Sequence, residues 1–121
     1  MASNANAALD ELMSVRGAVG VSLVDFTSGM SLITAGGNGL NLDLAAAGNS
    51  EVVLSKLRVM DSLGLKSKIE DILITLTDQY HLIRLLPEHK GVFLYYVLKR
   101  DEANLAIARL KLAEAESKIT F

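Results

Sequence analysis

The sequence predicts an α/β (α+β) domain in which five antiparallel strands form one sheet with helices on both faces, in the order αββαβββα. Residues 69–98 contain three apolar segments of similar length separated by two short turns, a pattern typical of a meander of antiparallel strands. The last segment, residues 92–98, is apolar at both alternating sets of positions, so it needs a cover on both faces and belongs in the centre of the sheet. Helical segments before, between and after the strands can supply both covers.

The first part of the chain predicts a short helix and a hairpin. Residues 7–15 carry an apolar stripe at helical spacing, and Asn6 is a candidate N-cap. Residues 18–25 and 30–35 read as two strands, and Gly29 in the turn between them can adopt the positive φ that such a turn needs.

A long helix is predicted over residues 43–63, with Asp43 as its cap and Gly64 as its stop. Its apolar face is expected to comprise Val52, Val53, Leu57, Val59, Met60 and Leu63. Residues 45–50 have only small side chains, which allows two interpretations. The segment is either a thin patch where the helix lies close to its own sheet, or a flat surface that admits the backbone of a second helix.

The second part of the chain predicts the meander and a final helix over residues 102–118. One buried stripe on that helix is expected to consist of Leu105, Ala108, Leu112, Ala115 and Ile119. Strands are expected at residues 69–76, 79–86 and 92–98, with residues 69–76 at an edge of the sheet. This edge is nearly all apolar and is charged only at Glu70 and Asp71, so we expect it to pair with another copy of itself.

The predicted dimer interface combines this edge with the small-residue surface of the long helix. It comprises Ala45, Ala46, Gly48, Asn49, Val53, Asp71, Ile72, Leu73, Ile74, Thr75 and Leu76.

Length and composition exclude several classes of protein. A chain of 121 residues is expected to form one domain over residues 1–121, and its 50% hydrophobic and 21% charged residues disfavour disorder. A net charge of −2 argues against nucleic acid as a partner. No apolar run approaches the roughly 20 residues that cross a bilayer, and no signal peptide is evident, so we expect a cytoplasmic protein without membrane insertion. The absence of cysteine removes disulfides and thiolate chemistry.

No residue pattern indicates catalysis, and no cofactor is expected. His81 and His89 lack the spacing and the neighbouring carboxylates of a metal site, so His81 is expected to pack in its strand and make one hydrogen bond. The serines at 22, 28 and 31 have no histidine at a motif spacing. Residues 36–39 are rich in glycine but lack the Lys-Ser/Thr of a phosphate-binding loop.

Two charged residues in strands have a structural and a functional interpretation. Asp25 ends a strand at a turn, where a hydrogen bond from its side chain to the turn backbone explains its presence. Arg84 lies among apolar residues, and we expect its aliphatic stem to pack under a helix with the guanidinium at the rim. The alternative for Arg84 is a contact with a partner protein.

Several stretches of the chain carry a resemblance to a known family. They are residues 17–25, 28–30, 43–53, 69–76, 79–84 and 103–109, and together they span nearly the whole chain. These stretches and the order of elements resemble the roadblock/dynein light-chain family, particularly its bacterial members. The resemblance is carried by structural signatures and not by active-site motifs.

The resemblance implies a roadblock/profilin-like fold and a homodimer whose sheet continues through two paired edge strands. The middle helices of the two copies would pack side by side on one face of that sheet, and the first and last helices would lie on the other. Family members act without a cofactor, as light chains, scaffolds or regulators of Ras-like small GTPases. In the regulators the GTPase docks on the paired middle helices, and no arginine finger is supplied.

The leading hypothesis is a non-catalytic adaptor or regulator whose partner is a Ras-like small GTPase or a sensor-kinase complex. Asn49, Lys56 and Arg58 are the polar positions of the long helix that are expected to face that partner. The alternative is a small-molecule sensor of GAF or PAS type, which needs a roomy apolar pocket. Because only 5% of the residues are aromatic and the long helix carries small side chains, we expect no large cavity. An enzyme comes third.

Overall fold

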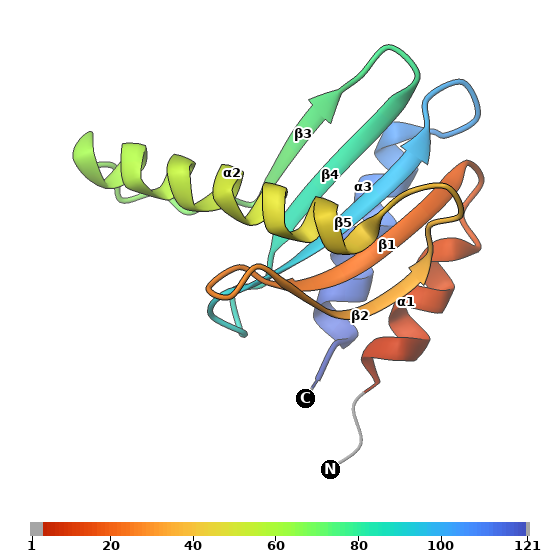
Figure 1. Ribbon diagram of the computed structural model, residues 1–121, viewed down its shortest axis with the longest axis horizontal. Helices are drawn as coiled ribbons and strands as arrows, with labels where there is room; N and C mark the ends of the chain where they lie inside the picture. Colours follow the sequence, from red (N-terminus) through yellow and green to blue (C-terminus); the bar gives the residue numbers. More distant parts are fainter. Residues whose placement is uncertain (1–3, 121) are drawn as a thin grey trace.

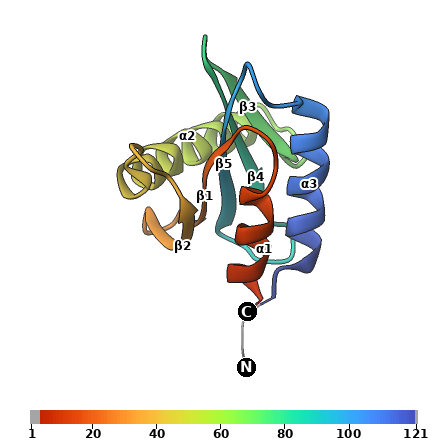
Figure 2. The same ribbon diagram turned by 90° about the vertical axis from the view of Figure 1, so that its right-hand side faces the viewer.

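In the computed structural model, which describes residues 4–120, the elements follow the predicted order. They are α1 (Ala5–Met13), β1 (Ala18–Asp25), β2 (Met30–Gly36), α2 (Leu42–Ser62), β3 (Asp71–Thr75), β4 (Gln79–Leu85), β5 (Val92–Lys99) and α3 (Leu105–Lys118). Figure 2 shows three layers, with α1 and α3 on one side of the sheet and α2 on the other.

The five strands form one antiparallel sheet in the order β2-β1-β5-β4-β3. The predicted central strand is confirmed, because β5 pairs with β1 on one side and β4 on the other. Residues 93–98 of β5 are buried without interruption, as expected for a strand covered on both faces. β2 and β3 are the two edges of the sheet.

Each face of the sheet has its own apolar core. The core under α1 and α3 includes Leu9, Leu12, Val21, Leu23, Leu82, Leu94, Tyr96, Leu98, Ala108 and Leu112. The core under α2 includes Val24, Leu42, Ala46, Val53, Ile83, Phe93, Tyr95 and Val97. Successive residues of β5 alternate between the two cores, as the period of a strand requires.

The predicted helix starts were off by one to three residues, and asparagine side chains explain where α2 and α3 begin. α2 begins at Leu42 because Oδ1 of Asn41 accepts the N–H of Leu44 at 3.0 Å, so Asp43 lies in the first turn and is not the cap. α3 begins later than residue 102, because Oδ1 of Asn104 accepts the N–H of Ile107 at 3.1 Å. The first helix begins at Ala5 after Asn4, so Asn6 lies inside it.

The edge strand β3 is shorter than predicted, because its neighbour ends early. In the observed register Asp71 lies opposite Arg84. Continuing that register would place Ile69 opposite Leu86, which leads directly into the Pro87 turn. A turn that begins with proline cannot continue the ladder of hydrogen bonds, so Ile69 has no partner in β4 and the pairing ends near Asp71.

Candidate interaction surface

The second half of α2 projects past the edge of the sheet (Figure 1). The first half covers the sheet, where Leu42, Ala46, Ser50 and Val53 are buried. Figure 1 shows the helix continuing beyond the base of β3, and the chain then returns through residues 63–70 to that strand. With 21 residues, α2 is long enough to span the sheet and extend past it, at a length of about 30 Å.

A stripe of exposed apolar and small residues runs along the outside of α2. This outer stripe consists of Leu44, Gly48, Val52, Val59 and Leu63, whose four apolar side chains are 69%, 41%, 46% and 65% exposed. Val52, Val59 and Leu63 were predicted to extend the buried face, and that prediction was wrong. The spacings of four and seven residues place the stripe on one side of the helix, and none of its members carries a charge. An uncharged apolar stripe in solvent marks a surface that a second molecule can cover.

Gly48 lies within the outer stripe and contacts nothing in its own chain. A Cβ at this position would have no neighbour within 4 Å among the described residues outside the adjoining helix backbone. The interpretation that the small residues bring the helix close to its own sheet is therefore wrong at Gly48. The second interpretation, a flat surface for another helix backbone, stays a prediction.

The other predicted interface residues of α2 lie nearer to the sheet. Ala46 and Val53 are fully buried in the core under α2, so their side chains already pack within the chain. Ala45 and Asn49 are half-buried between that core and the outer stripe. The side-chain amide of Asn49 donates to the carbonyl of Ala45 at 2.9 Å.

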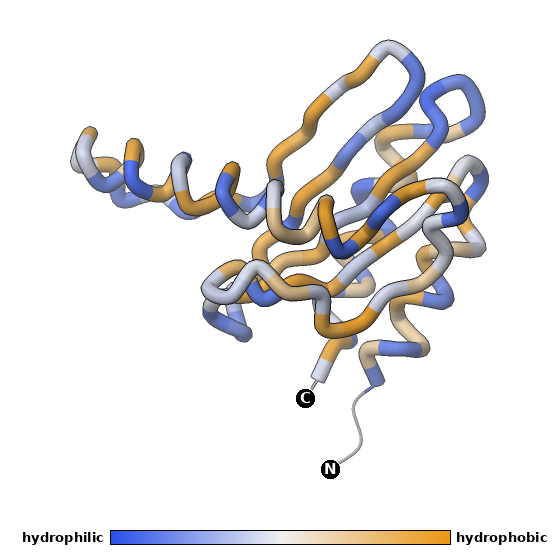
Figure 3. The backbone as a smooth tube through the Cα atoms, viewed as in Figure 1, coloured by the Kyte–Doolittle hydropathy of each residue, from blue (hydrophilic) through white to orange (hydrophobic). Residues whose placement is uncertain are grey.

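The predicted edge residues lie on β3 and just beyond it. Ile72 packs toward the core under α2 and Leu73 toward the core under α3, and Ile74 lies on the same face as Ile72. Residues 72–74 are half-buried, whereas Thr75 and Leu76 are exposed. Figure 3 shows β3 as hydrophobic along most of its length, although no further strand of the described chain pairs with its outer edge.

Asp71, at the start of β3, is engaged within the chain. Its Oδ1 accepts from the guanidinium of Arg109 on α3 at 3.1 Å. This pair neutralises the carboxylate at the edge, so the charge does not face an incoming strand alone.

The three polar positions predicted to meet a partner do not share one face of α2. Lys56 and Arg58 are both exposed, and Asn49 is half-buried. Residues two positions apart on an α-helix point roughly 160° away from each other. A single partner surface can therefore contact Lys56 or Arg58 closely, but not both.

His81 and Tyr95 form a polar cluster on the sheet face toward α2. The Tyr95 hydroxyl lies 3.0 Å from Nδ1 of His81, and Nε2 of His81 lies 2.8 Å from Oε1 of Gln79. The two rings meet edge to face with centroids 5.5 Å apart. Burial lowers the pKa of His81, partly opposed by the nearby Asp78 carboxylate, and burial raises the pKa of Tyr95. His81 thus makes two hydrogen bonds, one more than predicted.

The structural interpretations of the two charged strand residues are confirmed. Nε of Arg84 donates to Oε1 of Glu116 on α3 at 2.8 Å, under the helix as expected. Oδ1 of Asp25 accepts from the hydroxyl of Thr27 at 2.6 Å and from its backbone N–H at 2.9 Å. These bonds lower the pKa of Asp25. These contacts account for the presence of both charged residues within the chain.

The described residues contain neither a metal-binding cluster nor a membrane-spanning helix. Within residues 4–120, no group of three or more His, Asp or Glu side chains is arranged to hold a metal ion. No helix in the same range is long and apolar enough to cross a membrane.

A cavity of about 550 Å³ lies at one end of the sheet. The prediction that the chain has no large cavity was therefore wrong. We call this cavity the end cavity. It is lined by Phe26, Leu57, Ser67, Lys68, Ile69, Glu70, Arg84, Leu85, Leu86, Pro87, Lys90, Gly91, Val92 and Glu116. These residues come from three separate loops and four elements that meet only in the folded chain, so no local sequence pattern indicates the cavity.

Solved structures match the chain over almost its whole length. Myxococcus xanthus MglB is 18% identical with a TM-score of 0.84, over 95% of this chain and 84% of that one. A Roadblock/LC7 domain from Streptomyces avermitilis is 14% identical with a TM-score of 0.79, over 93% of this chain and 91% of that one. The chain has a roadblock fold. The resemblance seen in the sequence is confirmed at the level of the fold.

A third structure with the roadblock fold is described as MglB with a tetrameric arrangement. It is 17% identical with a TM-score of 0.79, over 93% of this chain and 82% of that one. No protein-family model matches the sequence, and no curated protein matches it.

Proposed function

We propose that the protein is a non-catalytic, homodimeric adaptor or regulator that binds a protein partner, with a Ras-like small GTPase or its signalling complex as the partner class. The observation that carries the proposal is the outer stripe, which runs along both halves of α2. A monomer would leave this surface in water, whereas a second copy laid alongside would bury it.

Two features of the chain support a dimer built from α2 and β3 together. The apolar side chains of the outer stripe are exposed to solvent, and the exposed fraction of Leu44 is 69%. The outer edge of β3 offers unpaired backbone groups beside apolar side chains, which natural proteins rarely leave bare. A specific interface usually buries more than about 1,000 Å², which neither feature is expected to supply alone.

A leucine in place of Gly48 tests the dimer. Because a Cβ there meets nothing in its own chain, Gly48→Leu should leave the fold intact and raise the intrinsic stability of α2 by up to about 1 kcal/mol. The same side chain should hold two helices apart and weaken the dimer at least tenfold. Light scattering across a dilution series measures the dissociation constant of the dimer. Urea unfolding at the lowest protein concentration measures the free energy of unfolding of the monomer.

The matched control is Asp61→Leu, which adds a leucine to the exposed surface of α2 about 140° around the helix from Gly48, outside the outer stripe. Asp61→Leu should leave the dimer much closer to the wild type than Gly48→Leu does. A wild-type chain that stays at 13.0 kDa at high concentration would overturn the dimer, and equal dissociation constants for wild type and Gly48→Leu would overturn the stripe as its interface.

The partner platform is tested by separate charge reversals. Because Lys56 and Arg58 point in different directions, Lys56→Glu and Arg58→Glu should not weaken partner binding equally. Binding of a Ras-like small GTPase from the same organism, loaded with GDP or GTP, is measured by its association rate at several salt concentrations. A rim charge acts mainly on that rate, so the effective reversal should slow association and reduce its dependence on salt.

Dimer mass and melting temperature serve as controls and should be unchanged by either reversal. If neither reversal alters the association rate, the partner surface lies elsewhere on the dimer. If no Ras-like GTPase binds the wild-type dimer, the partner class is wrong while the dimer stands.

A second candidate function, a small-molecule sensor, is favoured by one observation. The end cavity has the size of a ligand site, since such sites usually measure about 300–1,000 Å³. A sensor of this kind would not require a GTPase partner, and direct ligand binding distinguishes the two functions.

A further inference from the structure

The end cavity combines an apolar interior with positive charge on its lining. Leu57 of α2, Leu85 of β4 and Val92 of β5 contribute aliphatic side chains from both faces of the sheet. Phe26 contributes an aromatic ring that stacks on Phe93, with centroids 6.1 Å apart. Such a lining removes the alkyl part of a ligand from water, which is worth about 0.8 kcal/mol for each buried methylene group.

The charges that line the cavity divide into a pair and three free groups. Arg84 and Glu116 neutralise each other at 2.8 Å, and their side chains are only 21% and 17% exposed. Lys68 and Lys90 are exposed and form none of the ion pairs found among residues 4–120, and the same holds for Glu70. The free groups therefore leave one positive charge in excess on a mainly apolar cavity.

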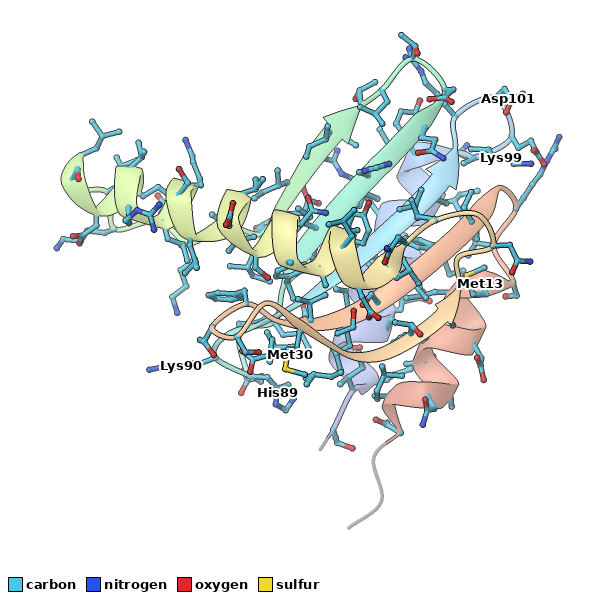
Figure 4. The ribbon with its side chains drawn as sticks, viewed as in Figure 1. Met13, Met30, His89, Lys90, Lys99 and Asp101 are labelled. Carbon is cyan, nitrogen blue, oxygen red and sulfur yellow. The ribbon has the colours of Figure 1, made fainter. Side chains whose placement is uncertain are left out.

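The two lysines come from separate segments that meet at the same end of the sheet. Lys68 belongs to the connection between α2 and β3, and Lys90 belongs to the turn between β4 and β5. Figure 4 shows Lys90 at the opposite end of the sheet from Lys99 and Asp101. The hollow at that other end is lined by Thr77, Asp78, Gln79 and residues 99–102, so it lacks an apolar interior.

We propose that the end cavity binds a small amphipathic monocarboxylate, a molecule with an aliphatic body and one carboxylate group. The aliphatic body would lie against Leu57, Leu85 and Val92, and the carboxylate would take its hydrogen bonds from Lys68 and Lys90. One excess positive charge matches one carboxylate, and hydrogen bonds between charged groups are the stronger ones. The volume of about 550 Å³ is within the usual range for such ligands.

This inference deepens the second candidate function and does not rest on dimerisation. Leu57 belongs to the projecting half of α2, so a bound ligand would contact the helix that carries the outer stripe. Binding and molar mass must therefore be measured on the same samples.

The test is a calorimetric titration of the full chain with decanoate and, separately, with decyltrimethylammonium. The two probes have the same alkyl chain and opposite charges. Decanoate should bind saturably with one site per chain, and decyltrimethylammonium should bind at least tenfold more weakly. The double variant Lys68→Met/Lys90→Met should weaken decanoate binding about tenfold or more, since each charged hydrogen bond is worth more than a factor of ten when removed.

The matched control is Lys66→Met/Lys99→Met, which removes the same charge from two exposed lysines that do not line the cavity. Decanoate should bind this variant as it binds the wild type. A third variant, Leu57→Trp, should fill the cavity and abolish binding of decanoate without changing the lysines.

Three results would overturn the proposal. One is the absence of saturable decanoate binding to the wild type, and another is equal binding of both probes. The third is decanoate binding to the Gly48→Leu variant alone, which would show that a second copy occupies the cavity in the dimer. If the wild type binds decanoate but no Ras-like GTPase, the cavity proposal stands and the partner class fails.

Discussion

The two faces of the sheet differ in how completely the chain covers them. On the face of α1 and α3, contacts fasten the helices to the strands, with Arg84 bonded to Glu116 and Arg109 bonded to Asp71. The Tyr96 hydroxyl on the same face donates to the carbonyl of Leu12 at 2.6 Å. On the other face, none of the ion pairs among residues 4–120 includes a residue of α2.

The difference supports the proposal that the face of α1 and α3 serves the fold and the face of α2 serves association. The face of α1 and α3 is fully covered within one chain, because both helices pack a continuous apolar stripe against the strands. We call it the finished face. The face of α2 is unfinished, because half of that helix lies beyond the sheet (Figure 1). Substitutions on the face of α1 and α3 should therefore lower the free energy of unfolding, and substitutions on the outer stripe should raise the dissociation constant of the dimer.

The largest expected effect is on the finished face. Leu112 of α3 is 1% exposed, so Leu112→Ala should lower the free energy of unfolding by about 2–5 kcal/mol through lost burial and a cavity. Leu110→Ala on the same helix is the matched control, because Leu110 is 57% exposed and its loss should change that free energy by no more than about 0.5 kcal/mol. Urea unfolding measures both. Equal losses would mean that α3 does not close this face.

The next effect compares the two ion pairs between α3 and the sheet. Arg84→Met leaves the carboxylate of Glu116 without its partner in a site where that side chain is 17% exposed, and it should cost about 1–3 kcal/mol. Arg109→Met breaks a pair whose arginine is 45% exposed and should cost about 0–1 kcal/mol. Chemical denaturation of both variants, with Glu116→Gln added to complete a double-mutant cycle, gives the coupling energy. A smaller cost at Arg84 than at Arg109 would contradict this order.

A smaller effect compares the two neighbouring tyrosines of β5, which point to opposite faces. Burial strongly raises the pKa of Tyr96, and its hydroxyl is held by the Leu12 carbonyl. Tyr96→Phe should therefore cost about 0.5–1.5 kcal/mol by leaving that carbonyl without its side-chain donor. Tyr95→Phe should lower the free energy of unfolding by less, because the half-buried His81 ring can form a hydrogen bond with water in place of the lost hydroxyl. Thermal unfolding of the two variants in parallel decides the order.

The smallest effect is a dependence on pH from the face of α2. Burial lowers the pKa of His81 below the usual 6.5, so the unfolded chain binds a proton more readily than the folded one. The free energy of unfolding should fall as pH decreases through 6.5 and stop falling below the folded pKa. His81→Leu should remove this part of the slope between pH 7.5 and pH 5.5, and His89→Gln is the control. An unchanged slope in His81→Leu would show that His81 does not cause it.

The sheet could be predicted from the sequence because the pattern of β5 has one physical solution. A strand with apolar residues at every position from Val92 to Leu98 must have neighbours on both sides and covers on both faces. The neighbouring order of β3, β4 and β5 then follows from the short turns between them, whereas the pairing of β5 with β1 was not predicted. The helix starts were less certain, because Asn41 and Asp43 are both good caps and only the backbone geometry shows which one is used.

The candidate surface was predicted in part. The edge strand β3 was found from its apolar run, but Val52 and Val59 were assigned to the buried face of α2 and are exposed. Periodicity shows that apolar residues share one arc of a helix, and it does not show which part of that arc meets the sheet. The end cavity was missed for another reason, since Lys68 and Lys90 meet only after the chain has folded.

The position of β5 in the centre of the sheet has a consequence for how the chain folds during its synthesis. β1 emerges early, yet its central neighbour β5 is separated from it by residues 26–91. Until the ribosome has delivered Lys99, the β1–β2 hairpin has no strand to complete the sheet, and the apolar sides of β1 remain open to solvent. Closing so long a segment carries an entropic cost before any central contact forms, so folding should be slow for a chain of this size. The sheet is therefore expected to form only after β5 has been translated, and not progressively from β1 onward.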